Sequence, residues 1–380
     1  MTHIFLMIVN DPAFFISHRL AVAQGARKAG YKVHIATMDG EAVKLITDEG
    51  FTHHLLPLSR SGSNPFFEFF ALFCIWRLLW RLRPDILHLV TIKPVIYGGI
   101  AARLAPVRGV VAAVSGLGYL FLSKGSKATL LRKVVSFFYK VALGKRNLRV
   151  IFQNPDDRDL LIGLGVLDPD KVEMVRGSGV DLSLYSFEPE RLDSLPVVCL
   201  AARLLRDKGV LEFVEAVRIL YQRGVKARFQ LIGDIDPGNP TTITEAEIST
   251  WREEGLIELL GYRKDIAKLF TDVNLVTLPS YREGLPKVLV EAAACGRAVV
   301  TTDVPGCRDA IEPDVTGLLV PMGNALALAD GLQLLIENSV LRQSMGAAGR
   351  ALAEGEFDLR KVVQQHLDIY SKLERASNHE

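Results

Sequence analysis

Two glutamates, Glu283 and Glu291, lie eight residues apart in the part of the sequence that carries the most chemical information. The first follows an apolar segment that ends near Pro279, and the second falls about two turns into the helix expected next. Free backbone N–H groups at a helix start attract anions, and carboxylates accept hydrogen bonds from neighbouring hydroxyls. We therefore predict that Glu283 binds the hydroxyls of a sugar and Glu291 those of a ribose; the alternative is a capping Glu283 and a solvated Glu291. The turn and helix start between them are expected to bind the same ligand: Gly284, Leu285, Pro286 and Lys287.

Two cations earlier in the chain, Arg203 and Lys208, form a second group. Arg203 is expected to end a strand, and Lys208 to lie in the turn or first helical residues that follow. Fixed cations beside a helix N-terminus suit a diphosphate, and Gly209 permits close approach of the backbone. Either cation alone is more typical of a solvated surface. Together with the two glutamates they predict a nucleotide diphosphate-sugar site.

The elements that must position these residues are short apolar strands alternating with longer helical patterns, which is typical of parallel α/β sheets. A chain of 380 residues is long enough for two domains. We predict two doubly wound domains over residues 1–182 and 183–361, joined by the polar segment 180–196, with a terminal helix at about 362–376 that packs back on the first. Ligands of such sheets bind beyond the carboxyl ends of the strands, so we expect the two domains to face a cleft. Strands are expected at 3–10, 31–37, 51–58, 85–91, 109–115, 149–154, 171–175, 197–203, 228–233, 257–261, 273–279, 298–302 and 317–320, and helices in the first domain include 16–28, 93–104 and 126–142.

These residues resemble the retaining glycosyltransferase family 4, which has the GT-B fold of two Rossmann-like domains. The mark of that family is Glu, seven residues, Glu, here Glu283 and Glu291, preceded by an Arg and Lys pair, here Arg203 and Lys208. Two further segments, 175–181 and 260–265, resemble the family's loop into the second domain and its base-binding turn, and the likeness covers essentially the whole chain. They add Ser178, Gly179 and Arg263 to the expected donor-binding residues.

The resemblance implies a transferase that retains anomeric configuration and uses a nucleotide sugar, with a lean to UDP. Arg203 and Lys208 would stabilise charge on the leaving diphosphate, and Glu283 would orient the sugar. Because these cations are fixed, no metal is expected, and the nucleotide sugar is a co-substrate, so no cofactor is expected either. The Asp168 and Asp170 pair lies in a turn, where carboxylates usually form local hydrogen bonds.

A narrower resemblance lies in segments 17–19, 59–66 and 116–119, which are similar to bacterial enzymes that extend undecaprenyl-diphosphate-linked sugars, such as the N-acetylgalactosaminyl transferases of glycan and O-antigen assembly. It implies a lipid-linked saccharide acceptor bound by the first domain. Many family members carry a histidine close to the reacting carbon, and Val114-Ser115-Gly116 occupies that place here. The role of that histidine is therefore expected to come from elsewhere, to come from Ser115, or to be dispensable. The expected acceptor-binding residues are His18, Arg19, Lys93 and Ser115.

The net charge of +2 conceals an uneven distribution. Residues 1–180 hold 23 Lys and Arg against 13 Asp and Glu, whereas residues 181–380 hold 22 against 30. The basic half is expected to face an anionic membrane or a phosphorylated acceptor, or else its charges are simply solvated. The aromatic run 66–76 is shorter than the ~20 apolar residues of a membrane span. With the arginines after it, this run predicts an amphipathic helix that lies on a membrane or packs inside the protein: Arg77, Arg81 and Arg83.

The four cysteines lack a metal-binding or disulfide spacing, and Cys199 and Cys295 are expected in the core. The N-terminus reads as a strand and not as a signal peptide, so we expect a cytoplasmic protein at the inner face of the cytoplasmic membrane. Nucleic acid is not an expected partner. Three alternatives stay open: a nucleotide-sugar epimerase of the same fold, a transferase acting on a soluble acceptor, and a two-lobed sugar-binding protein.

Overall fold

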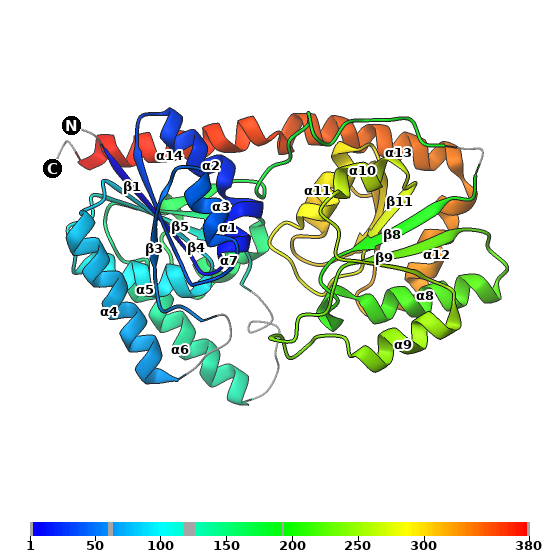
Figure 1. The fold of residues 1–380 in the computed structure, drawn as a ribbon, viewed down its shortest axis with the longest axis horizontal. Helices are drawn as coiled ribbons and strands as arrows, with labels where there is room; N and C mark the ends of the chain where they lie inside the picture. The colour runs from blue at the N-terminus through cyan, green and yellow to red at the C-terminus, as the bar shows by residue number, and fades with distance from the viewer. Residues whose placement is uncertain (1–2, 60–63, 118–125, 192–193, 378–380) are drawn as a thin grey trace. The chain divides into compact units, whose positions relative to one another are not determined.

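The computed structural model describes residues 3–59, 64–117, 126–191 and 194–377, and the chain divides into two units. The first comprises Met1–Ser178 together with Arg360–Glu380, and the second comprises Gly179–Leu359. Each unit is built on one parallel sheet covered by helices (Figure 1). The prediction of two Rossmann-like, doubly wound units is therefore confirmed. Residues 60–63 and 118–119, which contribute to the likeness on the acceptor side, lie outside the described residues.

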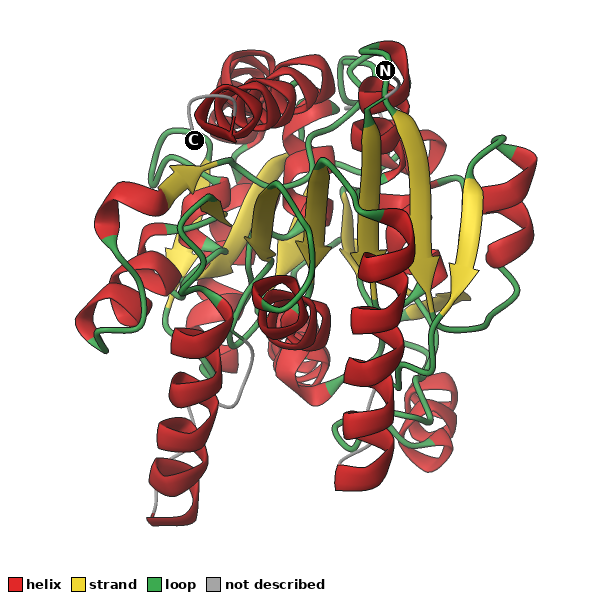
Figure 2. Cartoon of the chain, turned by 90° about the vertical axis from the view of Figure 1, so that its left-hand side faces the viewer, coloured by secondary structure: helices red, strands yellow, loops and turns green. Residues whose placement is uncertain are grey.

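The first sheet has seven strands in the order β3-β2-β1-β4-β5-β6-β7, seen face-on in Figure 2. Its central strands are mostly apolar because helices cover both faces, as in other all-parallel sheets, and His88 on the central Ile86–Val90 strand is an exception. The strand order reverses between β1 and β4, so residues that follow β1, β4 and β5 meet at one edge of the sheet. The strands are β1 (Ile4–Val9), β2 (Lys32–Thr37), β3 (Thr52–Leu55), β4 (Ile86–Val90), β5 (Gly109–Val114), β6 (Leu148–Phe152) and β7 (Val172–Met174).

Two hydrophobic clusters lie on opposite faces of this sheet. One is completed by α4 (Pro65–Leu82), α5 (Ile92–Arg103), α6 (Ser126–Ala142) and α7 (Pro155–Gly163). The other is completed by α1 (Pro12–His18), α2 (Leu20–Lys28), α3 (Val43–Asp48) and the C-terminal helix α14 (Leu359–Ser377). In Figure 1, α4 and α6 accordingly lie on the side of the sheet away from α2 and α14.

The expected helix at 16–28 is wrong in one respect, because the chain forms two helices there. α1 begins at Pro12, capped by the Asp11 carboxylate, and ends at His18. Arg19 adopts a non-helical conformation with φ −131° and ψ −9°, and α2 follows it. The break directs Arg19 into the core, where it is 2% exposed.

The helix α4 presents apolar side chains on two faces. Ala71, Ile75 and Leu79 are buried against α5 and the sheet. The opposite face carries exposed aromatic side chains: Phe66, Phe69, Phe70, Phe73 and Trp80, between 45% and 88% exposed. Within the described part of the chain, no helix is both long and apolar enough to cross a membrane.

The second sheet has six strands in the order β10-β9-β8-β11-β12-β13, with its reversal between β8 and β11. All six match the strands expected from the sequence. They are β8 (Val197–Ala201), β9 (Arg228–Ile232), β10 (Glu258–Gly261), β11 (Leu275–Leu278), β12 (Ala298–Thr302) and β13 (Gly317–Val320). The helices are α8 (Val210–Gln222), α9 (Glu245–Glu254), α10 (Ile266–Thr271), α11 (Lys287–Ala294), α12 (Ala325–Glu337) and α13 (Ser339–Leu352).

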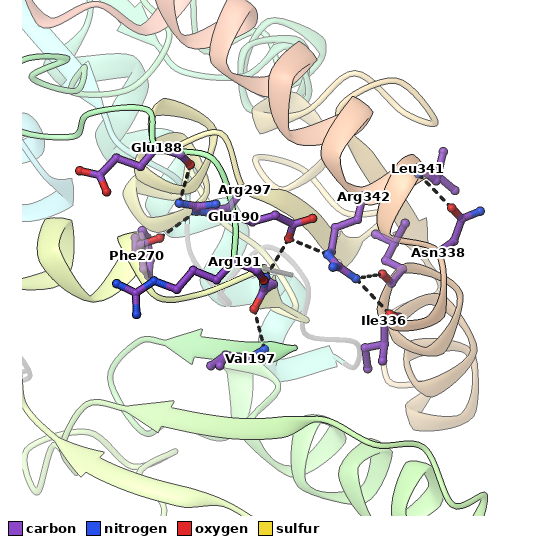
Figure 3. Close-up of polar contacts among 12 residues, drawn as sticks. Glu188, Glu190, Arg191, Val197, Phe270, Arg297, Ile336, Asn338, Leu341 and Arg342 are labelled. Carbon is purple, nitrogen blue, oxygen red and sulfur yellow. Dashed lines mark hydrogen bonds and ion pairs between the residues drawn. The ribbon is translucent and has the colours of Figure 1, made fainter. Parts of the chain in front are cut away.

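A buried polar network holds the segment that leads into β8 (Figure 3). Arg342 Nε donates to Glu190 Oε2 at 2.8 Å, and both side chains are at most 5% exposed. Arg297 donates to the Glu188 carbonyl at 2.9 Å, and Asn274 bridges Glu190 to the backbone of Val197. The segment expected as a linker is therefore anchored at its C-terminal end, because these buried charges are satisfied only when it lies in place.

Candidate active site

The predicted catalytic residues of the second unit follow the two strands at which its sheet reverses order. Arg203 and Lys208 come after β8, and Glu283 comes after β11. These strands are hydrogen-bonded neighbours with parallel register, so their carboxyl ends lie side by side. This is the edge at which doubly wound sheets bind their ligands.

The structure joins Lys208 to Glu283 in an ion pair. The two side chains are only 21% and 13% exposed, and Ser280 Oγ also donates to Glu283 Oε1 at 2.7 Å. Ser280 is fully buried, and its Oγ also lies 3.0 Å from the Asp207 carbonyl oxygen. Residues that are 75 positions apart in the chain thus form a partly desolvated group of fixed charge and hydrogen-bonding capacity.

Two glycines allow the loops of this group to touch. Gly209 has φ +73°, and a Cβ there would lie 2.0 Å from the Pro279 carbonyl oxygen. Gly306 has φ +82°, and a Cβ there would lie 2.5 Å from the Glu283 carbonyl oxygen. Only glycine fits both the left-handed backbone and the close contact, so these positions fix how Lys208 approaches Glu283.

The second glutamate, Glu291, lies inside α11 and is 7% exposed. The hydroxyl of Tyr185 donates to Glu291 Oε1 at 2.6 Å, and Lys287 Nζ lies 3.2 Å from the same oxygen. Burial raises the pKa of the Tyr185 hydroxyl, so it remains a donor at neutral pH. A solvated Glu291, the alternative raised from the sequence, is wrong. The helix starts at Lys287 after the Gly284, Leu285 and Pro286 turn, as predicted.

The Arg203 guanidinium is half exposed and pairs with Asp236, Nη1 to Oδ2, at 2.6 Å. Beyond it, at the carboxyl ends of β9 and β10, lies a pocket of about 350 Å³. Arg263 forms a bidentate pair with Asp265 at 2.6 and 2.8 Å, on the loop after β10. The pocket is lined by Leu204, Leu231, Gly233, Asp234, Ile235, Glu245, Ile248, Arg252, Leu259, Leu260 and Gly261.

Ser178 and Gly179 lie where the first unit gives way to the second. Gly179 has φ +75°, and a Cβ there would lie 2.8 Å from the Leu359 Cα. The next residue, Val180, donates its backbone N–H to the Phe357 carbonyl at 2.8 Å. Gly179 therefore has a packing role, and donor binding by these two residues stays a prediction.

In the first unit, the structure brings Arg19 and Ser115 together. Arg19 Nη2 donates to Ser115 Oγ at 3.3 Å, and Nη1 donates to the His18 carbonyl at 3.1 Å. Burial lowers the pKa of Arg19 to about 10, which leaves it charged at neutral pH. His18 stacks on Phe14 with 4.1 Å between ring centroids. The Ser115 hydroxyl is thus held by a buried cation.

Lys93 follows β4, as predicted, but its charge is compensated. Its Nζ lies 2.5 Å from Glu68 Oε1 and donates to Ser59 Oγ at 3.0 Å. Tyr97 donates to the other Glu68 oxygen at 2.8 Å. Lys93 therefore ties the first turn of α4 to α5, and acceptor binding by this side chain would have to compete with that pair.

The remaining candidates for metal or thiol chemistry have local or core roles. Asp168 Oδ1 accepts from the Asp170 backbone N–H at 3.1 Å and caps a short 3₁₀ helix. In the ranges that the structure describes, no group of three or more His, Cys, Asp or Glu side chains is placed to hold a metal. Cys199 and Cys295 are buried, as expected, and burial raises the pKa of the Cys295 thiol to about 12.

Comparison with known families identifies the broad class to which this chain belongs. A model described as "Glycosyl transferase 4-like" matches residues 5–154, and one described as "Glycosyl transferases group 1" matches residues 195–338. The first range falls within the first unit and the second within the second unit. The chain belongs to the glycosyltransferases.

Curated relatives of this glycosyltransferase extend over most of its length. The N,N'-diacetylbacillosaminyl-diphospho-undecaprenol alpha-1,3-N-acetylgalactosaminyltransferase of Campylobacter jejuni is 29% identical over 381 residues, covering 94% of this chain and 98% of the relative. The UDP-Gal:alpha-D-GlcNAc-diphosphoundecaprenol alpha-1,3-galactosyltransferase of Escherichia coli is 26% identical, covering 79% and 78%.

Solved structures share the fold of this glycosyltransferase. A sucrose-phosphate synthase from Thermosynechococcus elongatus matches with a TM-score of 0.80 at 18% identity, covering 98% of this chain and all of that one. Anabaena HepE, solved in complex with UDP, matches with a TM-score of 0.76 at 20% identity, covering 98% and 100%. These matches agree with the GT-B architecture expected from the sequence.

The sequence did not reveal which side chains pair with the charged residues of the candidate donor site in this glycosyltransferase. Tyr185, Asp236 and Ser280 lie in ordinary polar contexts in the sequence, and nothing local marks them as hydrogen-bonded to Glu291, Arg203 and Glu283. Tyr185 and Glu291 are 106 positions apart, so their contact appears only once the sheet is formed. Asp236 offered one signal, because it follows β9 at the same edge of the sheet.

Proposed function

We propose that this glycosyltransferase transfers a hexose or N-acetylhexosamine from a UDP-sugar to a saccharide carried on a polyprenyl diphosphate, with retention of anomeric configuration. The observation that carries the donor half is the meeting of Lys208 and Glu283 at the carboxyl ends of β8 and β11. The names of the Campylobacter and Escherichia coli relatives, which state diphospho-undecaprenol-linked acceptors, support the acceptor half.

The donor site follows from the chemistry of its residues. Glu291, buried in α11, accepts hydrogen bonds from the ribose hydroxyls, and Glu283 orients the sugar through its hydroxyls. Lys208 and Arg203 lie on the loop after β8 and face the diphosphate, where they stabilise the negative charge that develops as the sugar leaves. Lys208 is already fixed by Glu283, so little reorganisation accompanies that step.

The acceptor proton passes to the departing phosphate oxygen, so no carboxylate nucleophile is required. Glu283 is committed to Lys208 and Ser280, which suits an orienting group better than an attacking one. In the first unit, Ser115 lies at the edge formed by β1, β4 and β5, with the Arg19 cation behind it. We assign Ser115 and His18 to acceptor binding.

We propose that this reaction takes place at the inner face of the cytoplasmic membrane, which holds the lipid-linked acceptor, and that the protein makes peripheral contact through α4. The aromatic side chains on the outer face of α4 are exposed, and Arg77 lies among them. An apolar face with cations is the composition of helices that lie in the interface of a membrane. The alternative in which α4 is buried against the sheet accounts for only one of its two apolar faces.

Assay of donor consumption with and without a lipid-linked acceptor tests the proposal. Transfer should require the acceptor, whereas an epimerase would convert the donor alone and a binding protein would leave it unchanged.

Lys208→Gln and Arg203→Gln should each lower turnover by ~10²-fold or more, because removing one preorganised donor in a site of this kind has that effect. The matched control is Arg206→Gln, a neighbouring cation paired with Glu247 outside the group, which should keep turnover within about threefold. Wild-type turnover of both Lys208→Gln and Arg203→Gln would reject the diphosphate assignment.

A further inference from the structure

A pocket of the first unit lies at the end of its sheet opposite to the candidate acceptor residues. It has a volume of about 670 Å³ and opens where α5 and α6 end and before β7 begins. These positions precede strands, so the pocket lies at the amino ends of the sheet, whereas Ser115 and Lys93 follow strands at the carboxyl ends. The lining residues are Arg103, Phe137, Lys140, Val141, Leu143, Gly144, Gly165, Val166, Leu167, Asp168 and Lys171.

Most of the polar side chains that line the pocket are cationic. Arg103, Lys140 and Lys171 contribute positive charge, and Asp168 contributes one negative charge that already accepts from the Asp170 backbone. Lys145 lies next to this group, because its Nζ donates to the carbonyl that precedes Arg103. Burial and the neighbouring Arg103 both lower the pKa of Lys145. An anion in the pocket would relieve their mutual repulsion.

The backbone holds these cations at the pocket. Arg103 Nη1 donates to the Val141 carbonyl at 3.1 Å, and Lys171 Nζ donates to the Lys145 carbonyl at 3.1 Å. A Cβ at Gly144 would lie 2.2 Å from Arg103 Nη1, so the guanidinium rests directly on this glycine. Each side chain keeps further N–H groups, since a guanidinium has five and an ammonium three.

The pocket is continuous with the exposed aromatic face of the same unit. Leu104 follows Arg103, is 68% exposed, and accepts through its carbonyl from the indoles of Trp76 and Trp80 on α4, at 3.2 and 3.0 Å. On the other side, Phe137 both lines the pocket and is 62% exposed, packed edge-on against Phe138. α5 contacts both α4 and α6, so apolar side chains flank the cationic pocket on two sides.

We propose that this pocket binds the phosphate headgroup of an anionic phospholipid while the aromatic side chains beside it enter the lipid surface. A soluble phosphate ester offers the same anion but no apolar surface for Phe137, Trp80 and Leu104, so the exposed side chains favour the lipid. The site extends the membrane contact proposed above with a second, headgroup-specific attachment point. It does not depend on glycosyl transfer, because none of its residues belongs to the donor or acceptor site.

Vesicle co-sedimentation tests the assignment with the full chain. Vesicles of phosphatidylcholine are compared with vesicles that also contain phosphatidylglycerol, for the wild type and for the triple variant Arg103→Gln, Lys140→Gln, Lys171→Gln. The triple variant should bind the anionic vesicles roughly 100-fold more weakly, because each near-surface cation strengthens such binding by about fivefold. Its affinity for phosphatidylcholine vesicles should not change.

The matched control removes three cations from helices that cover the opposite face of the same sheet: Lys28→Gln on α2, Lys44→Gln on α3 and Lys361→Gln on α14. Its binding should stay within about threefold of the wild type. Equal losses in the two triple variants would overturn the proposal in favour of general charge attraction. If the pocket triple variant unfolds, Lys140→Gln alone carries the test, because that side chain is exposed.

Two further measurements have different purposes. The first distinguishes a lipid headgroup from a soluble phosphate ester, and the second distinguishes the lipid-binding proposal from the proposed glycosyl transfer. Glycerol 3-phosphate is titrated against the wild type and should not bind at micromolar concentration. It should also not displace the protein from anionic vesicles. Displacement would assign the pocket to a soluble phosphate ester and overturn the lipid assignment. Transfer to a short soluble acceptor should proceed at the wild-type rate in the pocket triple variant. Loss of that transfer in a folded variant would mean that the pocket serves the reaction, contrary to the proposal.

Discussion

The acidic side chains of the candidate donor site each lie against a hydrogen-bond donor from a distant part of the chain. Glu291 accepts from Tyr185, and Glu283 pairs with Lys208. A buried carboxylate without such partners would be costly, because burial disfavours its charged form. The partners therefore hold two carboxylates in position where, in our proposal, hydroxyl groups arrive.

Replacing Glu291 with alanine should weaken the binding of UDP. The ribose would lose a charged acceptor, and hydrogen bonds to charged groups typically contribute ~1.5–3 kcal/mol, so the dissociation constant should rise about 10- to 150-fold. Isothermal titration calorimetry with UDP measures it. Glu253→Ala, a change of the same type at an exposed position of α9, should leave the affinity unchanged.

The variant Tyr185→Phe separates binding from packing at the same position. It removes the donor to Glu291 while keeping the ring in place, so UDP affinity should fall by less than in Glu291→Ala. If Glu291→Ala binds UDP as the wild type does and is still folded, Glu291 is a structural residue and the ribose assignment is wrong.

At this scale, the sequence predicted which residues carry charge but not how that charge is compensated. Glu283, Lys208 and Glu291 stood out because their spacing matched a family motif. Lys93 also follows a strand, as expected, but its pairing with Glu68 depends on the position of α4 beside α5, which no local pattern encodes. The buried location of Arg19 depends in the same way on the helix break, which a continuous amphipathic pattern conceals.

At the scale of elements, the turn between β8 and α8 depends on one glycine, Gly209, which permits both its left-handed backbone and its contact with Pro279. Gly209 and Gly224 both have φ +73°, but a Cβ at Gly209 would overlap the Pro279 carbonyl, whereas nothing lies within 4 Å of a Cβ at Gly224. The two glycines therefore separate the cost of a left-handed backbone from the cost of a steric overlap.

Gly209→Ala should destabilise the protein by roughly 2 kcal/mol or more beyond Gly224→Ala. Gly224→Ala should cost about 1 kcal/mol, the usual penalty for a left-handed alanine, because its surroundings are open. Urea denaturation of both variants measures the difference. Equal costs would mean that the contact of the turn with Pro279 relaxes easily and does not fix Lys208 in position.

The C-terminal helix α14 completes the first unit through buried aromatic and imidazole groups. Tyr370 and His88 share a hydrogen bond of 2.6 Å, and His366 stacks on His88 with 5.6 Å between centroids. Burial lowers the pKa of His366 to about 4 and also lowers the pKa of His88. Both side chains are therefore neutral in the folded protein at pH values where they are charged in the unfolded chain.

The free energy of unfolding should consequently fall as the pH is lowered. The unfolded state binds a proton at His366 near pH 6.5 and the folded state only near pH 4, so this contribution is complete above pH 6.5 and is lost between these values. The loss from His366 is about 3 kcal/mol. Chemical denaturation at a series of pH values should show a shallower slope for His366→Leu. Parallel curves for the variant and the wild type would show that His366 does not titrate in this way.

For the whole molecule, the alternation of apolar segments with helices was sufficient to predict two parallel sheets. Every strand of the second sheet lies within its expected range, because strands buried on both faces are apolar runs. The strand order was not predictable from these runs, because order depends on which neighbours the crossover helices select. The sequence also did not determine whether α4 packs inside the protein or lies on a membrane. A helix with apolar residues on two sides can bury only one of these sides within its own unit.

The outer face of α4 gives the last prediction, which concerns the protein as a whole on a membrane. At about 100° per residue, Phe66, Phe69, Phe73 and Trp80 fall on one side of the helix, opposite the buried Ile75. The triple variant Phe66→Ser, Phe69→Ser, Phe73→Ser should bind vesicles more weakly by roughly 2–4 kcal/mol, because partial insertion of each ring contributes about 1 kcal/mol.

Tryptophan fluorescence reports where the contact occurs. Brominated phospholipids should quench Trp76 and Trp80, which lie on α4, but not Trp251, which is 4% exposed in the second unit. A control that replaces exposed apolar residues of the second unit, Tyr221→Ser, Leu326→Ser and Val340→Ser, should retain vesicle binding. If vesicles bind the protein while Trp76 and Trp80 stay unquenched, α4 does not enter the lipid. The exposed rings would then have to be covered by another protein surface, since an apolar face of this extent is costly to leave in water.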